Sequence, residues 1–475
     1  MEEESDDSSD DEVQYSEILQ PPLINQLKKI LDEYPDDGQI LKEIIQNAED
    51  AEASLMKVLY DDRKINQDIS STKKQHFKKY FKGPALCIYN NAIFTESDWQ
   101  GIRMIYSSVK EFDPVKVGRF GLGFKSVFHI TDYPMIISGN QLLILDPHQK
   151  RSGRVCMIMK LNKMRKYKRM DVTDCLAAFE GMFGFTTETI EKGNFQGTLF
   201  RFPLREEKTE LSENIYDEIK VMDLFKAFKA EAPVELLFLK CLERIDLHWK
   251  FTDLGRDQDH DDSPVYSVNI SDSCVQNVRE GRNHVMNQLK TYGKKLANET
   301  FRINYRMTIE TLDDDNNHTD EWIIFHCVKG GNMSKELRIL SLDESLSYSP
   351  YASIAVPMEE DQFKGHVFCL MPLPLTENSL TGLPVHVNGY FALSQNRRHV
   401  KWPTADQMKQ GTYKDKSLRW NNCLITEVLA ELYYNVIEEL IEHTITSDSV
   451  CHSYKNYTRL SKDHGTLEEY FRAIV

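Results

Sequence analysis

The sequence predicts an α+β fold, and three observations indicate this class. Helix-like and strand-like segments do not alternate regularly along the chain, so βαβ units are not expected. Two predicted helices come first, a glycine-rich segment at residues 118–123 follows, and strand-like segments come after it. The 475 residues include 41% hydrophobic residues, enough for the cores of two or three domains. We therefore expect helices to cover one face of a mixed sheet, in at least two α+β units.

The chain begins with an acidic segment, residues 1–17. Eight carboxylates and no basic residue occupy its first twelve positions. Such a segment buries too little apolar surface to offset its ordering entropy, so we expect it to be disordered. Apolar residues then recur at helical spacing from Leu23 to Leu31 and predict a helix. A turn at residues 35–38 separates it from a second helix, expected at residues 39–53.

Short helices and strands are expected in the rest of the first half. The sequence from Thr95 to Asp98 resembles a capping box and predicts a helix from there to about Tyr106. A short apolar helix is expected at residues 124–130, directly after the glycines. Strands are expected at residues 55–60, 85–89, 135–138, 141–145 and 198–202.

A charged stretch at residues 205–212 marks the predicted domain boundary. Beyond it we expect a second α+β unit, with helices at residues 221–230 and 420–442 and strands at residues 245–249, 305–310, 322–328 and 366–371. The chain thus divides into the tail at residues 1–17, a first domain at residues 18–208 and a second domain at residues 209–475.

Composition excludes several classes of protein. The formal net charge of −16 argues against a general nucleic-acid binder, because such proteins gain affinity by neutralising phosphates. No run approaches the ~20 apolar residues that a membrane helix needs, and the acidic N-terminus does not resemble a presequence. The nine cysteines are scattered and never spaced as CxxC, which is typical of reduced thiols. We therefore expect a cytoplasmic protein without a nucleic-acid or membrane partner.

The helix expected at residues 39–53 presents three polar side chains on one face. At about 100° per residue, Glu43, Asn47 and Asp50 fall within about 60° of one another, while the apolar residues of the segment lie on another face. A carboxylate can activate water, and an amide oxygen can bind a hard cation such as Mg²⁺. The alternative is an ordinary amphipathic helix whose polar face is solvated.

The glycine-rich segment is suited to binding an anion. Gly118, Gly121 and Gly123 allow close backbone approach to a ligand, and free N–H groups at a helix start can bind phosphate. It is not a Walker loop, because Phe124 separates the last glycine from Lys125. The alternative for this segment alone is a flexible loop.

Together these segments resemble the GHKL ATPase family, whose members have the Bergerat α/β sandwich. The shared features are Glu-x-x-x-Asn-Ala-x-Asp, then Gly-x-x-Gly-x-Gly-Phe-x-Ser, then a strand that begins with Gly-Thr. The family includes the ninety-kilodalton heat-shock chaperone and type II topoisomerases, and the resemblance extends from about residue 20 to residue 205. It implies a GHKL sandwich followed by a second α+β domain.

The resemblance also implies roles for individual residues. Glu43 would be the general base, Asn47 the Mg²⁺ ligand and Asp50 a residue of the nucleotide pocket, with Thr198 near the adenine of ATP. The ATP phosphates would bind backbone N–H groups in the segment of Gly118, Arg119, Phe120, Gly121, Leu122, Gly123 and Phe124.

A narrower resemblance covers more of the chain. Five segments, which begin at Gly38, Gly83, Tyr89, Leu145 and Gly382, are similar to the repeats of the sacsin family. It extends from about residue 18 to at least Trp402, and so includes the second domain. This family is chaperone-related, which implies client proteins and other chaperones as partners and leaves self-association open.

The chain departs from the GHKL pattern at the adenine site. Family members carry Asp-x-Gly-x-Gly there, and this sequence has Asn90, Asn91 and Ala92 instead. An asparagine oxygen could still accept a hydrogen bond from adenine, but loss of the charge costs about 1–2 kcal/mol. Two hypotheses follow: a slow ATPase that uses ATP and Mg²⁺, or a non-catalytic scaffold with a degenerate pocket.

If the protein is an ATPase, two further segments would take part in the reaction. Arg397 and Arg398 in the second domain could act as arginine fingers on the γ-phosphate, although a solvated basic turn or an internal salt bridge also explains them. The polar residues 106–116 would form a lid over the nucleotide. The lone His129 and His148 are interpreted as structural.

Overall fold

The structure of the protein is a computed structural model with α+β architecture. It describes residues 22–33, 36, 39–64, 79–81, 83–103, 123–148, 155–166, 177–250, 264–292, 296–313, 316–358, 363–375, 379–394, 398–403, 407 and 414–446. The predicted acidic tail and the predicted lid at residues 106–116 lie outside these ranges.

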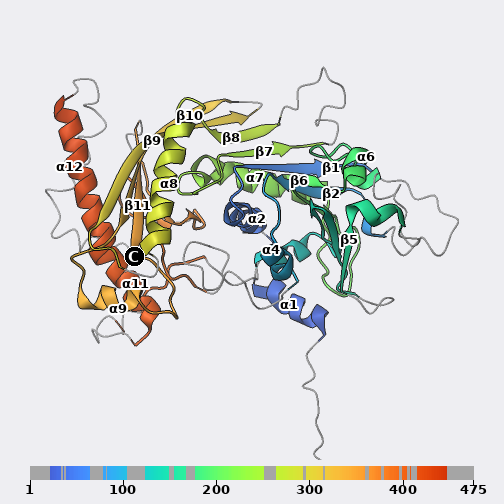
Figure 1. The fold of residues 1–475 in the computed structure, drawn as a ribbon, viewed down its shortest axis with the longest axis horizontal. Helices are drawn as coiled ribbons and strands as arrows, with labels where there is room; N and C mark the ends of the chain where they lie inside the picture. Colours follow the sequence, from blue (N-terminus) through green and yellow to red (C-terminus); the bar gives the residue numbers. More distant parts are fainter. Residues whose placement is uncertain are drawn as a thin grey trace, which may run out of the picture.

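One mixed sheet runs along the molecule (Figure 1). It contains fourteen strands in the order β13-β12-β14-β11-β10-β9-β8-β7-β1-β2-β6-β3-β4-β5. Their bounds are β1 Leu55–Asp61, β2 Ala85–Asn90, β3 Met135–Gly139, β4 Gln141–Leu145, β5 Cys156–Lys160, β6 Phe195–Pro203, β7 Arg244–His248, β8 Tyr266–Ile270, β9 Phe301–Asp313, β10 His318–Val328, β11 Tyr351–Pro357, β12 Val367–Cys369, β13 Met371–Pro372 and β14 His386–Gly389.

The sheet continues across the domain boundary predicted at residues 205–212. Strand β1 pairs antiparallel with β2 of the first half and parallel with β7 of the second half. The division at residue 208 stays a prediction, but the two halves share a backbone hydrogen-bond ladder.

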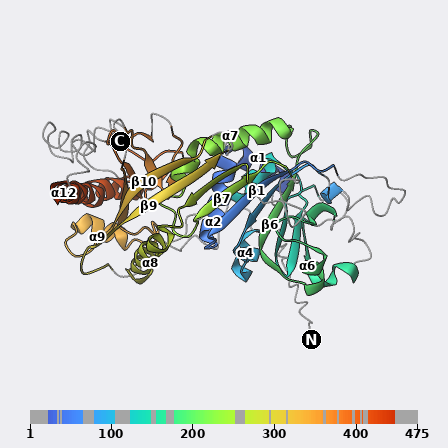
Figure 2. The same cartoon turned by 90° about the horizontal axis from the view of Figure 1, so that it is seen from above.

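Helices cover both faces of the sheet. One face carries α1 (Leu23–Glu33), α2 (Gln39–Asp50), the 3₁₀ helix η2 (Gly123–His129) and α7 (Glu218–Glu235), which pack in a single apolar cluster with the strands. On the other face, residues 178–190 cover the first half, and α9 (Lys335–Ser341), η6 (Leu424–Leu429) and α12 (Ala430–Thr446) cover the second half. Helix α12 lies at one end of the molecule and α6 (Thr187–Lys192) near the other (Figure 2).

Most predicted elements are confirmed, with several corrections. The helix expected at residues 124–130 is the 3₁₀ helix η2, and the helix at residues 420–442 begins earlier, as α11 (Lys416–Cys423), and contains η6, a π-helical segment. The capped helix is α4 (Glu96–Gly101), whose described part is shorter than expected. The long helix α8 (Val275–Tyr292) was not predicted, because its few apolar residues are interrupted by charges and by Gly281.

Two general expectations can be compared with the described residues. Seven of the nine cysteines are described, and all seven are free thiols. Among the described helices, none has the length and apolar character needed to cross a membrane.

Candidate functional site

Helix α2 carries the three polar residues on a face that is not solvated. The side chains of Glu43 and Asp50 are 7% and 5% exposed, and Asn47 is half-buried. The apolar residues of α2 are also buried, so this is not an amphipathic helix with one face in water. The helix lies near the middle of the molecule's long axis (Figure 1).

The carboxylate of Glu43 lies directly against Gly123, the last glycine of the glycine-rich segment. A Cβ atom at Gly123 would overlap Glu43 Oε2 and lie 2.6 Å from Glu43 Cδ. A side chain at position 123 would therefore require the Glu43 carboxylate to move away from η2. The structure thus brings together two motifs that are eighty residues apart in the sequence.

The two asparagines at the predicted adenine site make local hydrogen bonds. Asn91 Oδ1 accepts the backbone N–H groups of Ser54 at 3.0 Å and Leu55 at 3.2 Å, and its Nδ2 donates to Ser54 Oγ at 2.9 Å. Asn90 is buried, and its Oδ1 accepts the Ala92 N–H at 3.1 Å. Both lone pairs of the Asn91 oxygen are therefore engaged in holding the turn after β2 to the start of β1.

Thr198 lies beside Asn90 across the β2–β6 ladder, and its place near an adenine stays a prediction. It is fully buried, and its hydroxyl donates to the carbonyl of Ala92 at 2.8 Å. Ser138 on β3 lies 2.8 Å from the Thr198 hydroxyl and accepts the N–H of Phe94, also at 2.8 Å. These hydroxyls fix the turn that follows β2.

Lys125 follows the glycines but points toward the end of α4. Its ammonium donates to the carbonyl oxygen of Ile102 at 2.8 Å, and its side chain is 3% exposed. Burial lowers the pKa of Lys125 to about 8, an effect that the nearby Cys156 thiol opposes. The Lys125 ammonium thus holds η2 to the end of α4.

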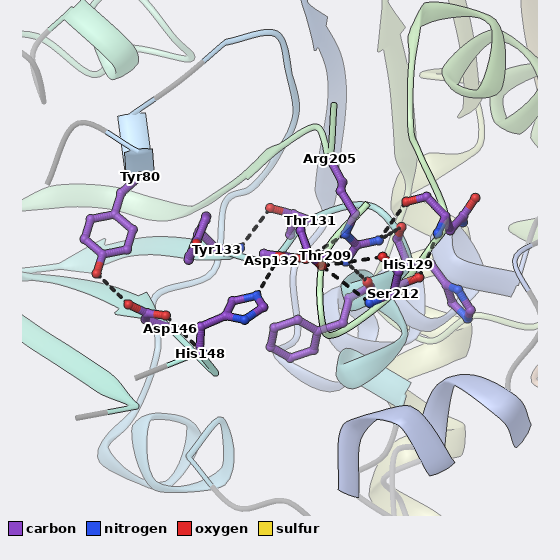
Figure 3. A network of polar contacts seen from close by, with 12 residues as sticks. Tyr80, His129, Thr131, Asp132, Tyr133, Asp146, His148, Arg205, Thr209 and Ser212 are labelled. Atoms are coloured by element: carbon purple, nitrogen blue, oxygen red, sulfur yellow. Dashed lines mark hydrogen bonds and ion pairs between the residues drawn. The ribbon is translucent and has the colours of Figure 1, made fainter. Parts of the chain in front are cut away.

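A buried polar network anchors the far end of η2 (Figure 3). The Arg205 guanidinium donates to the carbonyls of Phe128 at 2.5 Å and His129 at 2.8 Å, and to Asp132 Oδ1 at 2.7 Å. His148 Nε2 lies 2.6 Å from the other Asp132 oxygen. Burial alone would raise the pKa of Asp132, but the His148 hydrogen bond and the Arg205 charge outweigh it and lower that pKa. The His148 side chain thus belongs to this network, whereas His129 contributes its backbone carbonyl.

The remaining predicted site residues are only partly described. Gly123 and Phe124 lie in η2, whereas Gly118, Arg119, Phe120, Gly121 and Leu122 are outside the described residues, as is Arg397. Arg398 lies in the turn between Leu393 and Val400, which form an isolated bridge. Its role as an arginine finger stays a prediction. Among the described residues, no group of three or more His, Cys, Asp or Glu is arranged to hold a metal ion.

Three residues that the sequence did not single out contribute to the site. Ser138 fixes the turn after β2, Arg205 anchors η2, and Glu49 binds α2 to a distant loop. Ser138 could have been noticed as a polar residue at the end of an apolar strand. Arg205 was assigned to a charged boundary, and Glu49 had no local signal because its partners lie about 190 residues away.

Comparison with known proteins gives the family. Residues 20–261, about half of the chain, match the family described as the Sacsin domain. Sacsin from Homo sapiens is 39% identical over 439 residues, which cover 89% of this chain and 9% of sacsin. A crystal structure described as the N-terminal domain of a DNA repair protein aligns with 8% identity and a TM-score of 0.31, over 80% of this chain and 92% of that one, and it carries no argument. The chain belongs to the sacsin family.

Proposed function

We propose that this chain is a chaperone-related module that binds ATP with Mg²⁺ through a GHKL-type sandwich and hydrolyses ATP slowly. The observation that carries the proposal is the contact between Glu43 and Gly123. A buried carboxylate beside a glycine-rich segment suits a reaction in which water attacks a phosphate held by backbone N–H groups.

The residues of α2 fit Mg²⁺ and ATP in part. The Asn47 side chain is half-buried and makes no hydrogen bond within the described part of the chain, so its amide oxygen is available as a ligand. Bound Mg²⁺ would neutralise charge on the phosphate oxygens. On the adenine side the fit is weaker, because the Asn91 oxygen is already engaged. We therefore expect weak affinity for the nucleotide.

Each residue of the proposed site has one task. Glu43 would accept a proton from the attacking water, and Asp50 and Thr198 would contact the nucleoside. Gly123 would keep the glycine-rich segment close to Glu43. Turnover should be slow, and the bound nucleotide would order the predicted lid and shift the two halves of the chain.

The chaperone-related role rests on family membership. The chain spans 9% of human sacsin, so the activity and partners of the whole protein are proposals for this chain. We propose client proteins and other chaperones as its partners, in the cytoplasm.

A specific observation favours a second function, a non-catalytic scaffold. The side chains of Asn90 and Asn91 hold the turn after β2 to the strands around it, as a structural element would. These hydrogen bonds need no bound nucleotide, so a scaffold that had lost nucleotide binding would still keep the fold of this turn.

Titration calorimetry with Mg·ATP, together with phosphate release, separates the two functions. The ATPase predicts weak binding and slow turnover that Glu43→Ala abolishes. The matched control is Glu52→Gln, which removes the charge of an exposed carboxylate two residues after the end of α2. No heat at millimolar Mg·ATP would establish the scaffold, and turnover unchanged in Glu43→Ala would overturn the role of Glu43.

A further inference from the structure

The loop at residues 236–243, between α7 and β7, is bound by α2 through a buried carboxylate. Glu49 lies on α2 next to the candidate site and is 4% exposed. Its oxygens accept three successive backbone N–H groups, at 2.5 Å, 3.1 Å and 3.0 Å, from Lys240, Cys241 and Leu242. Hydrogen bonds to a charged acceptor are roughly twice as strong as neutral ones, and a buried carboxylate without them is costly. Separating the loop from Glu49 would therefore cost free energy, because the buried carboxylate would lose its hydrogen-bond donors.

Helix α8 binds the same loop through a buried guanidinium. Arg282 is 4% exposed and donates to the carbonyls of Leu242 at 2.9 Å and Leu236 at 2.6 Å. Leu242 thus has its N–H on the Glu49 carboxylate and its C=O on the Arg282 guanidinium. Consecutive hydrogen bonds that share a peptide group polarise one another, so each bond strengthens the next.

Packing gives the loop little freedom of its own. The side chains of Leu236, Leu237, Phe238 and Leu239 are all between 0% and 2% exposed. The Phe238 ring meets the Phe368 ring of β12 edge-on, with centroids 5.0 Å apart. At its far end, the N–H groups of Glu243 and Arg244 bind the carbonyl of Ser54, just after α2. Close-packed groups transmit a displacement to their neighbours.

We propose that this loop is a joint that couples α2 to α8, with Glu49 positioning residues 240–242 and Arg282 positioning Leu236 and Leu242. A displacement of α2 moves the three amides held by Glu49, and Arg282 passes the movement to α8 and to β9 beneath it. The coupling deepens the proposed function, because nucleotide bound at Glu43, Asn47 and Asp50 is what would displace α2. Because the coupling acts in both directions, a change at α8 in the second half of the chain would also alter nucleotide binding at this site.

Hydrogen–deuterium exchange of the whole chain tests the joint without nucleotide. Arg282→Lys keeps the charge but cannot reach both carbonyls, so the amides at the end of α2 should exchange several-fold faster than in the wild type. The matched control is Arg279→Lys, three residues earlier on α8, because Arg279 binds only the exposed side of the loop through the Glu243 carboxylate. The control should leave exchange in α2 unchanged.

Two results would overturn the joint. The first is faster exchange in α8 and the loop with unchanged exchange in α2. The second is an equal effect of Arg279→Lys on α2. If Arg282→Lys does not fold, Glu49→Asp tests the coupling in the opposite direction. Weakening the contact of α2 with the loop should then give faster exchange in α8.

A second experiment tests whether the joint affects nucleotide binding. In Arg282→Lys, the dissociation constant for Mg·ATP measured by calorimetry should rise several-fold, although Arg282 is on a different helix from the site. An unchanged constant contradicts the joint. Absence of binding in the wild type contradicts the proposed function instead, and the exchange experiment still decides the joint.

Discussion

At Gly123, the absence of a side chain allows η2 to approach Glu43. A Cβ there would lie 2.6 Å from Glu43 Cδ, so any larger residue at this position would have to displace the Glu43 carboxylate. At Asn91 the side chain has a local structural task, because its oxygen accepts two backbone N–H groups. The candidate site thus combines a close contact at Glu43 with a predicted adenine side at which the oxygen of Asn91 is already engaged.

Gly123→Ala should destabilise the protein by about 1–3 kcal/mol, because the new methyl overpacks the contact with Glu43. Urea unfolding of the variant measures the free energy. In a Glu43→Ala background the same substitution should cost much less, since the overlapping carboxylate is gone. Equal costs in both backgrounds would show that Glu43 does not lie against Gly123.

The burial of Glu235 leads us to expect that the stability of the protein depends on pH. It is fully buried, and neither carboxylate oxygen has a hydrogen-bond partner among the described residues. Burial raises the pKa of Glu235 from 4.5 to about 8, against the pull of the Lys42 charge. The folded protein therefore holds a proton that the unfolded chain releases, and the free energy of unfolding falls as pH rises from about 4.5 to about 8.

Glu235→Gln should remove this dependence, because an amide has no proton to lose. Thermal unfolding of wild type and variant between pH 5 and pH 8 measures the difference. The variant should gain stability relative to wild type with each step in pH. Parallel curves across this range would contradict the raised pKa.

At the scale of elements, α2 performs two tasks with carboxylates on different sides. Glu43 and Asp50 belong to the candidate site, whereas Glu49 binds residues 240–242 and Lys42 forms an ion pair with Glu231 on α7. The same helix thus carries the candidate site residues on one side and binds the second half of the chain with the other. This double duty explains why a helix with four charged residues is almost entirely buried.

Local signals predicted many elements, and distant contacts account for the rest. The capping box at Thr95 and the strand at residues 141–145 follow from short sequence patterns, and both are present. The pairing of β1 with β7 and the bonds of Glu49 join residues about 190 positions apart, so no local pattern contains them. The shared face of Glu43, Asn47 and Asp50 was predictable from helical spacing, but the contact of Glu43 with Gly123 of η2 was not.

Thr95→Ala should destabilise α4 by about 1 kcal/mol, the usual cost of losing an N-cap. The Thr95 hydroxyl accepts the Asp98 N–H, and the Asp98 carboxylate accepts the Thr95 N–H at 2.9 Å. Urea unfolding measures the loss. Ser97→Ala, an exposed change in the same turn, is the matched control, and an equal effect of both would contradict the capping role.

At the scale of the whole molecule, one sheet and one helix connect the two halves. The parallel pairing of β1 with β7 makes the sheet continuous, and α2 packs in the same apolar cluster as α7. A ligand on α2 would therefore contact the element that both halves share.

Hydrogen–deuterium exchange of the wild type, with and without saturating Mg·ATP, tests the nucleotide site most directly. We predict slower exchange in α2 around Glu43 and Asn47, and in η2 beginning at Gly123, with Mg²⁺ required for the effect. Equal exchange in these two segments with and without Mg·ATP, or protection confined to other parts of the chain, would contradict the proposed site.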